Sequence, residues 1–222
     1  MKVARGLLAV LAVLALASCS DSKKDAGGAP STAPSAPSAT PTVAESSSIP
    51  TASTPSLTPL PTPSKPWPTP TVTGAPADDA PLAERITFAI AKKTQIAAGK
   101  AAPTTVKCPG IDKVETAGQH SLDCTVTYAG KPFTGTLTVD AKQYSASYKF
   151  TSSKIAIARA KVVDAVLRTA PGASKVTCDM DETGIVVHDG PGVGCDVTTT
   201  ANAVQPYQAS ITGDGDVVVK KA

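Results

Sequence analysis

The chain has 222 residues, a formal net charge of +3 and an aromatic content of only 4%. It lacks the basic stripe with interleaved aromatic residues that nucleic-acid-binding proteins carry, so we expect no nucleic-acid partner. The composition is uneven, because 14 of the 20 prolines fall between residues 20 and 81. We therefore divide the chain into residues 1–18, 19–81, 82–153 and 154–222.

Residues 1–18 have the pattern of a secretory signal peptide. Lys2 and Arg5 give a basic start, and about twelve apolar residues follow, too few to span a bilayer. The signal ends at Leu16-Ala17-Ser18-Cys19, which resembles the lipobox of bacterial lipoproteins. This resemblance implies that Cys19 is acylated and becomes the first residue of the mature protein. We expect a protein that is lipid-anchored at the extracytoplasmic face of the cell membrane; a plain secretory signal is the alternative.

Residues 19–81 consist mainly of Pro, Ser, Thr and Ala and contain almost no large apolar side chains. Such a segment cannot bury enough surface to offset its conformational entropy, so we expect a disordered stalk after the lipidated Cys19. The single tryptophan, Trp67, lies in this segment between Pro66 and Pro68. It is either a docking motif for a proline-recognising partner or an incidental residue.

Each half of residues 82–222 begins with a helix candidate. Apolar residues at helical spacing run from Leu82 to Ala97, and a clearer stripe runs from Ile155 to Leu167, with Pro171-Gly172 as its stop. The candidate N-caps lie just upstream of each helix: Asp78, Asp79, Ser152 and Ser153.

After each helix, apolar residues alternate with polar ones, which predicts strands. Val106-Lys107-Cys108 recurs as Val176-Thr177-Cys178, and a second cysteine follows each after 16 or 17 residues within a hydrophobic-x-Cys-x-Val pattern. The sequence thus predicts an α+β fold with two small repeated units, residues 82–153 and 154–222. Each unit is one helix packed on an antiparallel sheet of three to four strands, behind the disordered stalk. The connection between the units is short, so we expect them to be in contact.

Four cysteines remain after Cys19, in a chain expected to pass into an oxidising compartment. Four cysteines allow three pairings, and the repeat favours Cys108 with Cys124 and Cys178 with Cys195. Each bridge would stabilise a unit of about 70 residues by about 3 kcal/mol. Free buried thiols are the alternative; the spacing offers no Cys-x-x-Cys redox motif.

The first unit resembles a known family. Cys108-Pro109, Gly118, Leu122, Cys124, Val126 and Gly130 are similar to the pattern of DUF4333 domains, modules of unassigned function in actinobacterial envelope proteins. The second unit departs from this pattern, since Asp179 replaces the proline and the segment between its cysteines is longer. The resemblance implies an actinobacterial lipoprotein with tandem DUF4333-like domains, the second copy diverged, and it brings no catalytic residues.

Candidate catalytic and metal-binding residues are few. The two histidines, His120 and His188, sit shortly before the second cysteine of each unit, and no nucleophile motif accompanies them, so we interpret both as exposed loop residues. Short acidic clusters could supply oxygen ligands for calcium, but they lack the glycine and terminal glutamate of a calcium loop. These clusters contain Asp179, Asp181, Glu182 and Asp189. We expect no catalytic residue, metal or cofactor.

These observations favour a non-enzymatic function. We expect two disulfide-stapled modules presented on a tether for binding wall polymer, another envelope protein or a small ligand held between helix and sheet. An accessory or inhibitory subunit of an envelope enzyme is the main alternative, and a hydrolase without a visible motif is a third.

Overall fold

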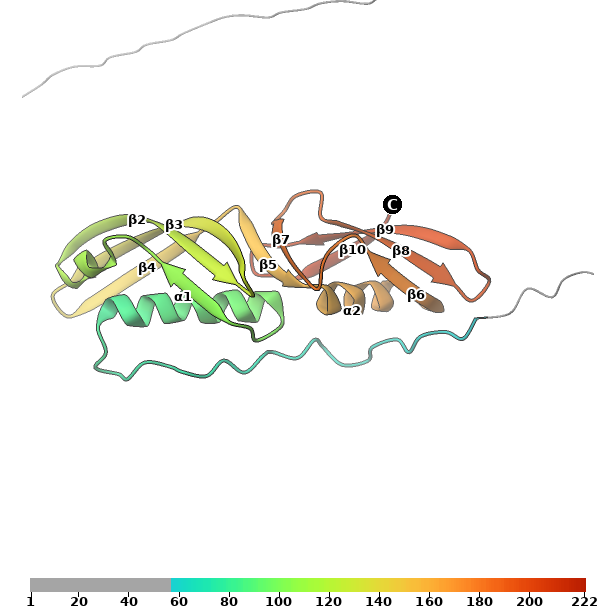
Figure 1. Ribbon diagram of the computed structural model, residues 1–222, viewed down its shortest axis with the longest axis horizontal. Coiled ribbons are helices and arrows are strands. Elements are labelled where there is room, and N and C mark those ends of the chain that lie inside the picture. Colours follow the sequence, from blue (N-terminus) through green and yellow to red (C-terminus); the bar gives the residue numbers. More distant parts are fainter. Residues whose placement is uncertain (1–56) are drawn as a thin grey trace, which may run out of the picture. The chain divides into compact units, whose positions relative to one another are not determined.

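The computed structural model describes residues 57–222. The signal peptide, Cys19 and the stalk up to residue 56 lie outside the described residues, and their assignments remain predictions. Within residues 57–222 the fold is α+β, with two α-helices and antiparallel sheets of four, two and four strands (Figure 1). The elements of the first half are α1 (Leu82–Ala98), β1 (Thr104–Lys107), the 3₁₀ helix η1 (Ile111–Glu115), β2 (Gly118–Tyr128), β3 (Lys131–Lys142) and β4 (Ser145–Thr151). Those of the second half are β5 (Lys154–Ala158), α2 (Arg159–Thr169), β6 (Ala173–Cys178), β7 (Thr183–Val187), β8 (Val193–Thr199), β9 (Val204–Ile211) and β10 (Val217–Lys221).

The first sheet has the order β1-β2-β3-β4, with every neighbouring pair antiparallel. Strands β2 and β3 are joined by Ala129 and Gly130, both at positive φ, which is the geometry of a two-residue hairpin turn. The alternation along β2 turns Cys124, Val126 and Tyr128 toward α1, where they are almost fully buried. Helix α1 therefore covers one face of this sheet, and the core lies between them.

The second four-stranded sheet has the order β10-β9-β8-β6 and packs against α2. Val162 and Val166 of α2 are fully buried in the same core as Val197 of β8 and Ile211 of β9. Apolar side chains recur about every four residues along the helix and every two along the strands, so each element turns one apolar face toward this core.

Strands β5 and β7 form a separate two-stranded ribbon, which differs from the sequence prediction. Ile155 and Ala158 belong to β5 and not to the second helix, because α2 begins only at Arg159. The ribbon has two buried faces: Ile157 packs in the core of the second half, whereas Ala156 and its partner Ile185 pack in the core of the first. The ribbon thus joins the two cores.

The predicted N-caps are also wrong. Helix α1 begins after Pro81 and α2 after Ala158, and neither start has a side-chain capping bond. Ser152 instead donates its hydroxyl to the carbonyl of Thr134 at 2.6 Å and accepts the backbone N–H of Lys154 at 3.0 Å. Its hydroxyl thereby fixes the turn between β4 and β5.

Residues 57–81, which the sequence assigns to a disordered stalk, instead have a defined place along the helices; we call them the strap (Figure 1). The backbone N–H of Leu60 donates to the carbonyl of Ala173 at 2.6 Å, and the guanidinium of Arg168 in α2 donates to the carbonyl of Lys65. The strap runs without regular secondary structure until α1 begins. The stalk boundary predicted at residue 81 therefore lies too far along the chain.

The C-terminus of α1 is where the strap and the second half converge. Gly99 ends the helix at a φ of 77°, and its carbonyl accepts the indole N–H of Trp67 at 2.8 Å. The ammonium group of Lys161 in α2 donates to the carbonyl of Ala97 at 2.9 Å. A Cβ at residue 99 would lie 2.5 Å from the indole nitrogen, so the glycine also makes room for Trp67. These partners satisfy carbonyls that a helix end leaves without intrahelical donors.

Two ion pairs also connect the halves. Lys131 lies 2.5 Å from a carboxylate oxygen of Asp181, and Lys100 lies 2.6 Å from one of Glu182. The lysines belong to the first half and the acidic residues to the segment between β6 and β7. The predicted contact between residues 82–153 and 154–222 agrees with these pairs and with the ribbon.

Candidate functional site

A cavity of about 520 Å³ opens between α1, the end of β4 and two turns of the second half. This volume lies in the range of small-molecule pockets. Lys93 and Thr94 face it from α1, and Asp214 faces it from the β9–β10 turn. The cavity is a place where a helix, a sheet edge and the second half meet.

The floor of this cavity is apolar. It is formed mainly by Ile90, Ala97, Phe133 and Ile155, each less than 8% exposed, together with the half-buried Phe150. These side chains belong to both hydrophobic cores, so packing holds the floor in position. An apolar part of a ligand would be removed from water here.

The rim of the cavity is predominantly cationic. Lys93, Lys149, Lys154 and His188 line it, and Asp214 is its acidic residue. Lys93 pairs with Asp214 at 3.5 Å, with both side chains largely exposed. Within residues 57–222, neither Lys149 nor Lys154 forms an ion pair. Two ammonium groups at this rim are thus available to an anion.

His188 is held at the rim through both ring nitrogens. Nδ1 lies 2.7 Å from a carboxylate oxygen of Asp189, and Nε2 lies 2.7 Å from the carbonyl oxygen of Ser152. Both partners accept hydrogen bonds, so this geometry favours the imidazolium form, in which both nitrogens donate. The bond to Asp189, and then the bond to Ser152, raise the pKa of His188 above its usual range. The histidine is thus paired with Asp189 beside the connection between β4 and β5.

A second hollow, of about 580 Å³, lies on the first sheet near its outer face. Polar side chains such as Gln119, Thr138 and Asp140 form most of its lining, and it has no apolar floor comparable to that of the first cavity. Tyr148 and Lys149 line both hollows. We regard the cavity beside α1 as the candidate site.

The two histidines that the sequence singles out have different surroundings. His120 lies within β2 and not in a loop, and its Nε2 is 2.9 Å from the carbonyl oxygen of Thr116. His188 follows β7 and lines the cavity. The structure therefore does not bring His120 and His188 together.

Three of the four acidic residues considered as metal ligands, Asp181, Glu182 and Asp189, have other partners. Lys131 and Lys100 bond Asp181 and Glu182 and lower the pKa of each carboxyl, while Asp189 bonds His188. Within residues 57–222, no three His, Cys, Asp or Glu side chains gather in an arrangement suited to a metal ion.

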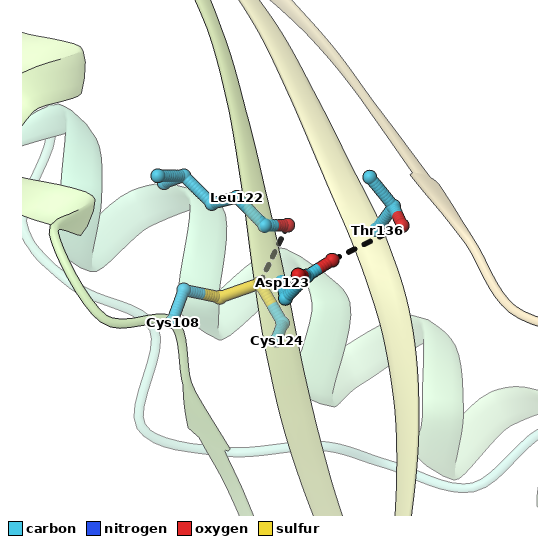
Figure 2. The surroundings of a disulfide bond; sticks show 5 residues. All are labelled: Cys108, Leu122, Asp123, Cys124 and Thr136. Carbon is cyan, nitrogen blue, oxygen red and sulfur yellow. Dashed lines mark hydrogen bonds between the residues drawn. A yellow bond between two sulfur atoms is a disulfide. The ribbon is translucent and has the colours of Figure 1, made fainter.

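The predicted disulfides are present, between Cys108 and Cys124 and between Cys178 and Cys195. The first bridge ties the segment after β1 to β2, next to the Asp123 side chain that contacts Thr136 of β3 (Figure 2). All four cysteines are at most 6% exposed. These cysteines stabilise the fold and are not free thiols.

Sequence reasoning missed the cavity and the role of Trp67. The cavity depends on which turns approach α1, and no local pattern in Lys149, Lys154 or Asp214 indicates that approach. Trp67 did carry a signal, since a lone tryptophan among prolines is unusual in a stalk without apolar residues. Its partner, the carbonyl of Gly99, is a backbone group that sequence cannot reveal.

Comparison with protein-family models, with curated proteins and with solved structures finds no match in any of the three. No helix in the part of the chain from residue 57 onward is both long and apolar enough to cross a bilayer.

Proposed function

We propose that this chain is a lipid-anchored, extracytoplasmic binding protein of the cell envelope that acts without catalysis. Its anchor is the acylated Cys19. Its globular part consists of two disulfide-stapled DUF4333-like modules, the second a diverged copy of the first. The cavity beside α1, with an apolar floor and a cationic rim, is the observation that carries the binding role.

The order of elements supports the tandem arrangement. Helix α1 precedes a sheet ordered β1-β2-β3-β4, and α2 precedes a sheet ordered β6-β8-β9-β10. In each sheet a disulfide links the end of the first strand to the second: Cys178 pairs directly with Cys195, and Lys107 pairs with Thr125 one step from the other bridge. A duplicated unit with β5 and β7 added in the second copy accounts for both sheets.

The environment of His188 supports binding over acid–base catalysis. A general base needs a free nitrogen within reach of the proton that it accepts. Asp189 and Ser152 occupy both ring nitrogens of this histidine. Its raised pKa reflects these bonds and requires no catalytic role.

The two disulfides support an extracytoplasmic location, because such bonds persist in oxidising compartments. The anchor itself is tested by comparing the full chain with its Cys19→Ala variant in a bacterial host. We expect the full chain in the detergent-soluble membrane fraction with a mass increase from acylation. Equal fractionation of the two chains would contradict lipid anchoring.

The binding role is tested by a pull-down with residues 20–222, which retain the strap, at two salt concentrations. Purified wall fractions and solubilised envelope proteins are offered separately. We expect a saturable partner that is lost when the cavity is filled by Ala89→Leu and kept with Ala91→Leu. Retention of every partner by Ala89→Leu would contradict a role for the cavity.

A second candidate is an accessory or inhibitory subunit that binds through a sheet edge. Among the strands of residues 57–222, β4 pairs with β3 alone, and six of its seven residues are exposed. Tyr144, next to this strand, is 90% exposed. An unpaired edge of this kind can accept an extended peptide by strand addition. Capture of a defined protein that Ser147→Pro abolishes and Ala89→Leu leaves intact would favour this function.

A further inference from the structure

We propose that the cavity beside α1 binds a small amphipathic anion, an apolar body that carries one acidic head group, such as a medium-chain carboxylate. This inference rests on the proposed binding function and specifies its ligand. It is carried by the separation of apolar and cationic groups around one cavity.

The apolar body fits the floor. Ile90 and Ala97 of α1, Phe133 of β3 and Ile155 of β5 are buried apolar side chains that line the cavity. Removing the apolar surface of a ligand from water favours binding. A fully polar anion would gain nothing from this floor, so the floor selects for an apolar portion.

The acidic head fits the rim. Lys149 at the end of β4 and Lys154 at the start of β5 lie on either side of the short connection through Ser152. Neither lysine has an ion-pair partner within residues 57–222. His188, bonded to the carbonyl of Ser152 and paired with Asp189, lies beside the same connection, but neither of its ring nitrogens is free for a ligand. A carboxylate here can accept hydrogen bonds from the ammonium groups of Lys149 and Lys154.

Asp214 limits the head group to one side of the cavity. It lies on the β9–β10 turn and is paired with Lys93 at 3.5 Å. An anion beside Lys93 would meet this carboxylate, whereas Lys149 and Lys154 have no acidic partner within residues 57–222. The charges therefore orient the ligand, with its head at the β4–β5 connection and its body toward α1.

The test is isothermal titration calorimetry with residues 20–222 and three probes: decanoate, decanol and acetate, all below the micelle concentration. Decanol keeps the body without the charge, and acetate keeps the charge without the body. We expect decanoate to bind and decanol to bind about fivefold more weakly, which is the upper range for an exposed charge contact. Acetate should show no measurable binding, because it has no apolar body to bury. Equal binding of decanol, or no binding of decanoate, would overturn the proposal.

Matched variants locate the bound molecule. Lys149→Gln and Lys154→Gln should each weaken decanoate binding about twofold to fivefold, whereas Lys220→Gln on β10 should leave it unchanged. Ala89→Leu, on the cavity side of α1, should abolish binding, and Ala91→Leu on the same helix should not. Binding that survives Ala89→Leu would place decanoate elsewhere and overturn the proposal.

These outcomes separate the two proposals. If decanoate fails while Ala89→Leu still removes a partner in the pull-down, the ligand class is wrong and the binding cavity stands. If decanoate does not bind and Ala89→Leu removes no partner in the pull-down, both the proposed ligand and the binding role of the cavity are contradicted. Circular dichroism of each variant, with the disulfides intact, shows whether its fold is retained.

Discussion

The two halves of the globular part combine the same order of helix and sheet with different means of holding the helix. Helix α1 has 17 residues and is fixed at its C-terminus by Trp67 and Lys161 from outside the first half. Helix α2 has 11 residues and is preceded by β5, which pairs with β7. The difference shows that the end of the helix in the first half is held by the strap and by α2. The second half supplies the ribbon that joins both cores.

The largest expected loss of stability comes from truncating a buried side chain of this ribbon. Ile157 is fully buried in the core of the second half, so Ile157→Ala should reduce the free energy of unfolding by about 2 to 5 kcal/mol. Val187 on the partner strand is 50% exposed, and Val187→Ala should change it little. Urea denaturation followed by circular dichroism measures both.

The same experiment decides whether the halves are coupled. Because the ribbon packs against both cores, we expect one unfolding transition in the wild type and in Ile157→Ala. Two separate transitions would show that the halves unfold independently.

Removing either disulfide should cost about 3 kcal/mol, since the bridges close loops of similar length, with separations of 16 and 17 residues. Paired alanine variants, Cys108→Ala with Cys124→Ala and Cys178→Ala with Cys195→Ala, test this by urea denaturation. A negligible loss of stability for one pair alone would mean that other contacts hold that half together. It would contradict the expectation that the two bridges contribute equally.

Trp67→Ala should act on the first half through the strap. The side chain is half-buried and donates one hydrogen bond, so we expect a loss of about 1 to 2 kcal/mol, less than for a fully buried tryptophan. Hydrogen exchange at the C-terminal turn of α1 should rise, while exchange in α2 should change less. Pro68→Ala, at an exposed neighbour, is the control, and equal effects of the two variants would contradict the role of the indole.

His188 should make stability depend on pH near neutrality. Its pKa is raised in the folded state, so its contribution is fully present below the ordinary pKa of about 6.5 and is lost as pH rises through the raised value. The stability difference between wild type and His188→Asn should therefore shrink from pH 6 toward pH 9. His120→Asn is the comparison, and NMR titration of His188 measures the pKa directly; an unshifted value would contradict the paired-donor geometry.

The smallest effect is expected from the exposed ion pairs between the halves. The pKa values of Asp181 and Glu182 are lowered by Lys131 and Lys100, so their contribution is present above the ordinary values of 3.8 and 4.5. It is lost as pH falls through the lowered values. The double variant Asp181→Asn with Glu182→Gln should differ slightly from wild type at pH 7 and converge with it in acid. Added salt should have the same effect, because surface pairs are screened.

Local patterns predicted much of the fold. Alternation along residues such as Leu122, Cys124 and Val126 indicated β2, and the repeated cysteine spacing indicated the pairing of the bridges. Patterns failed where one residue suits two structures: Ile155 and Ala158 are three residues apart, as on a helix face, but they belong to β5. The partner of that strand, β7, is about 30 residues away, and pairing at that distance leaves no local signal.

The candidate site was less predictable than the fold. A small ligand between helix and sheet was one of three expected targets and stays a prediction, and the residues that form the cavity were not identified. Lys149 and Lys154 look like ordinary surface lysines in the sequence, and only the packing of β5 beside α1 places them at one rim. The strap was missed for a related reason. Composition indicates whether a segment can form its own core, but it does not indicate whether the segment packs along the surface of another part of the chain.

The strap also determines how the protein would carry mechanical load. In a chain held by an anchor at Cys19, a pull enters the globular part at Leu57 and not at the start of α1. The bonds of Leu60 and Lys65 must break before the indole of Trp67 leaves Gly99, and only then does tension reach Leu82. Peeling these 25 residues, from 57 to 81, releases up to about 80 Å of chain. The strap would therefore lengthen in steps before tension reaches the first core.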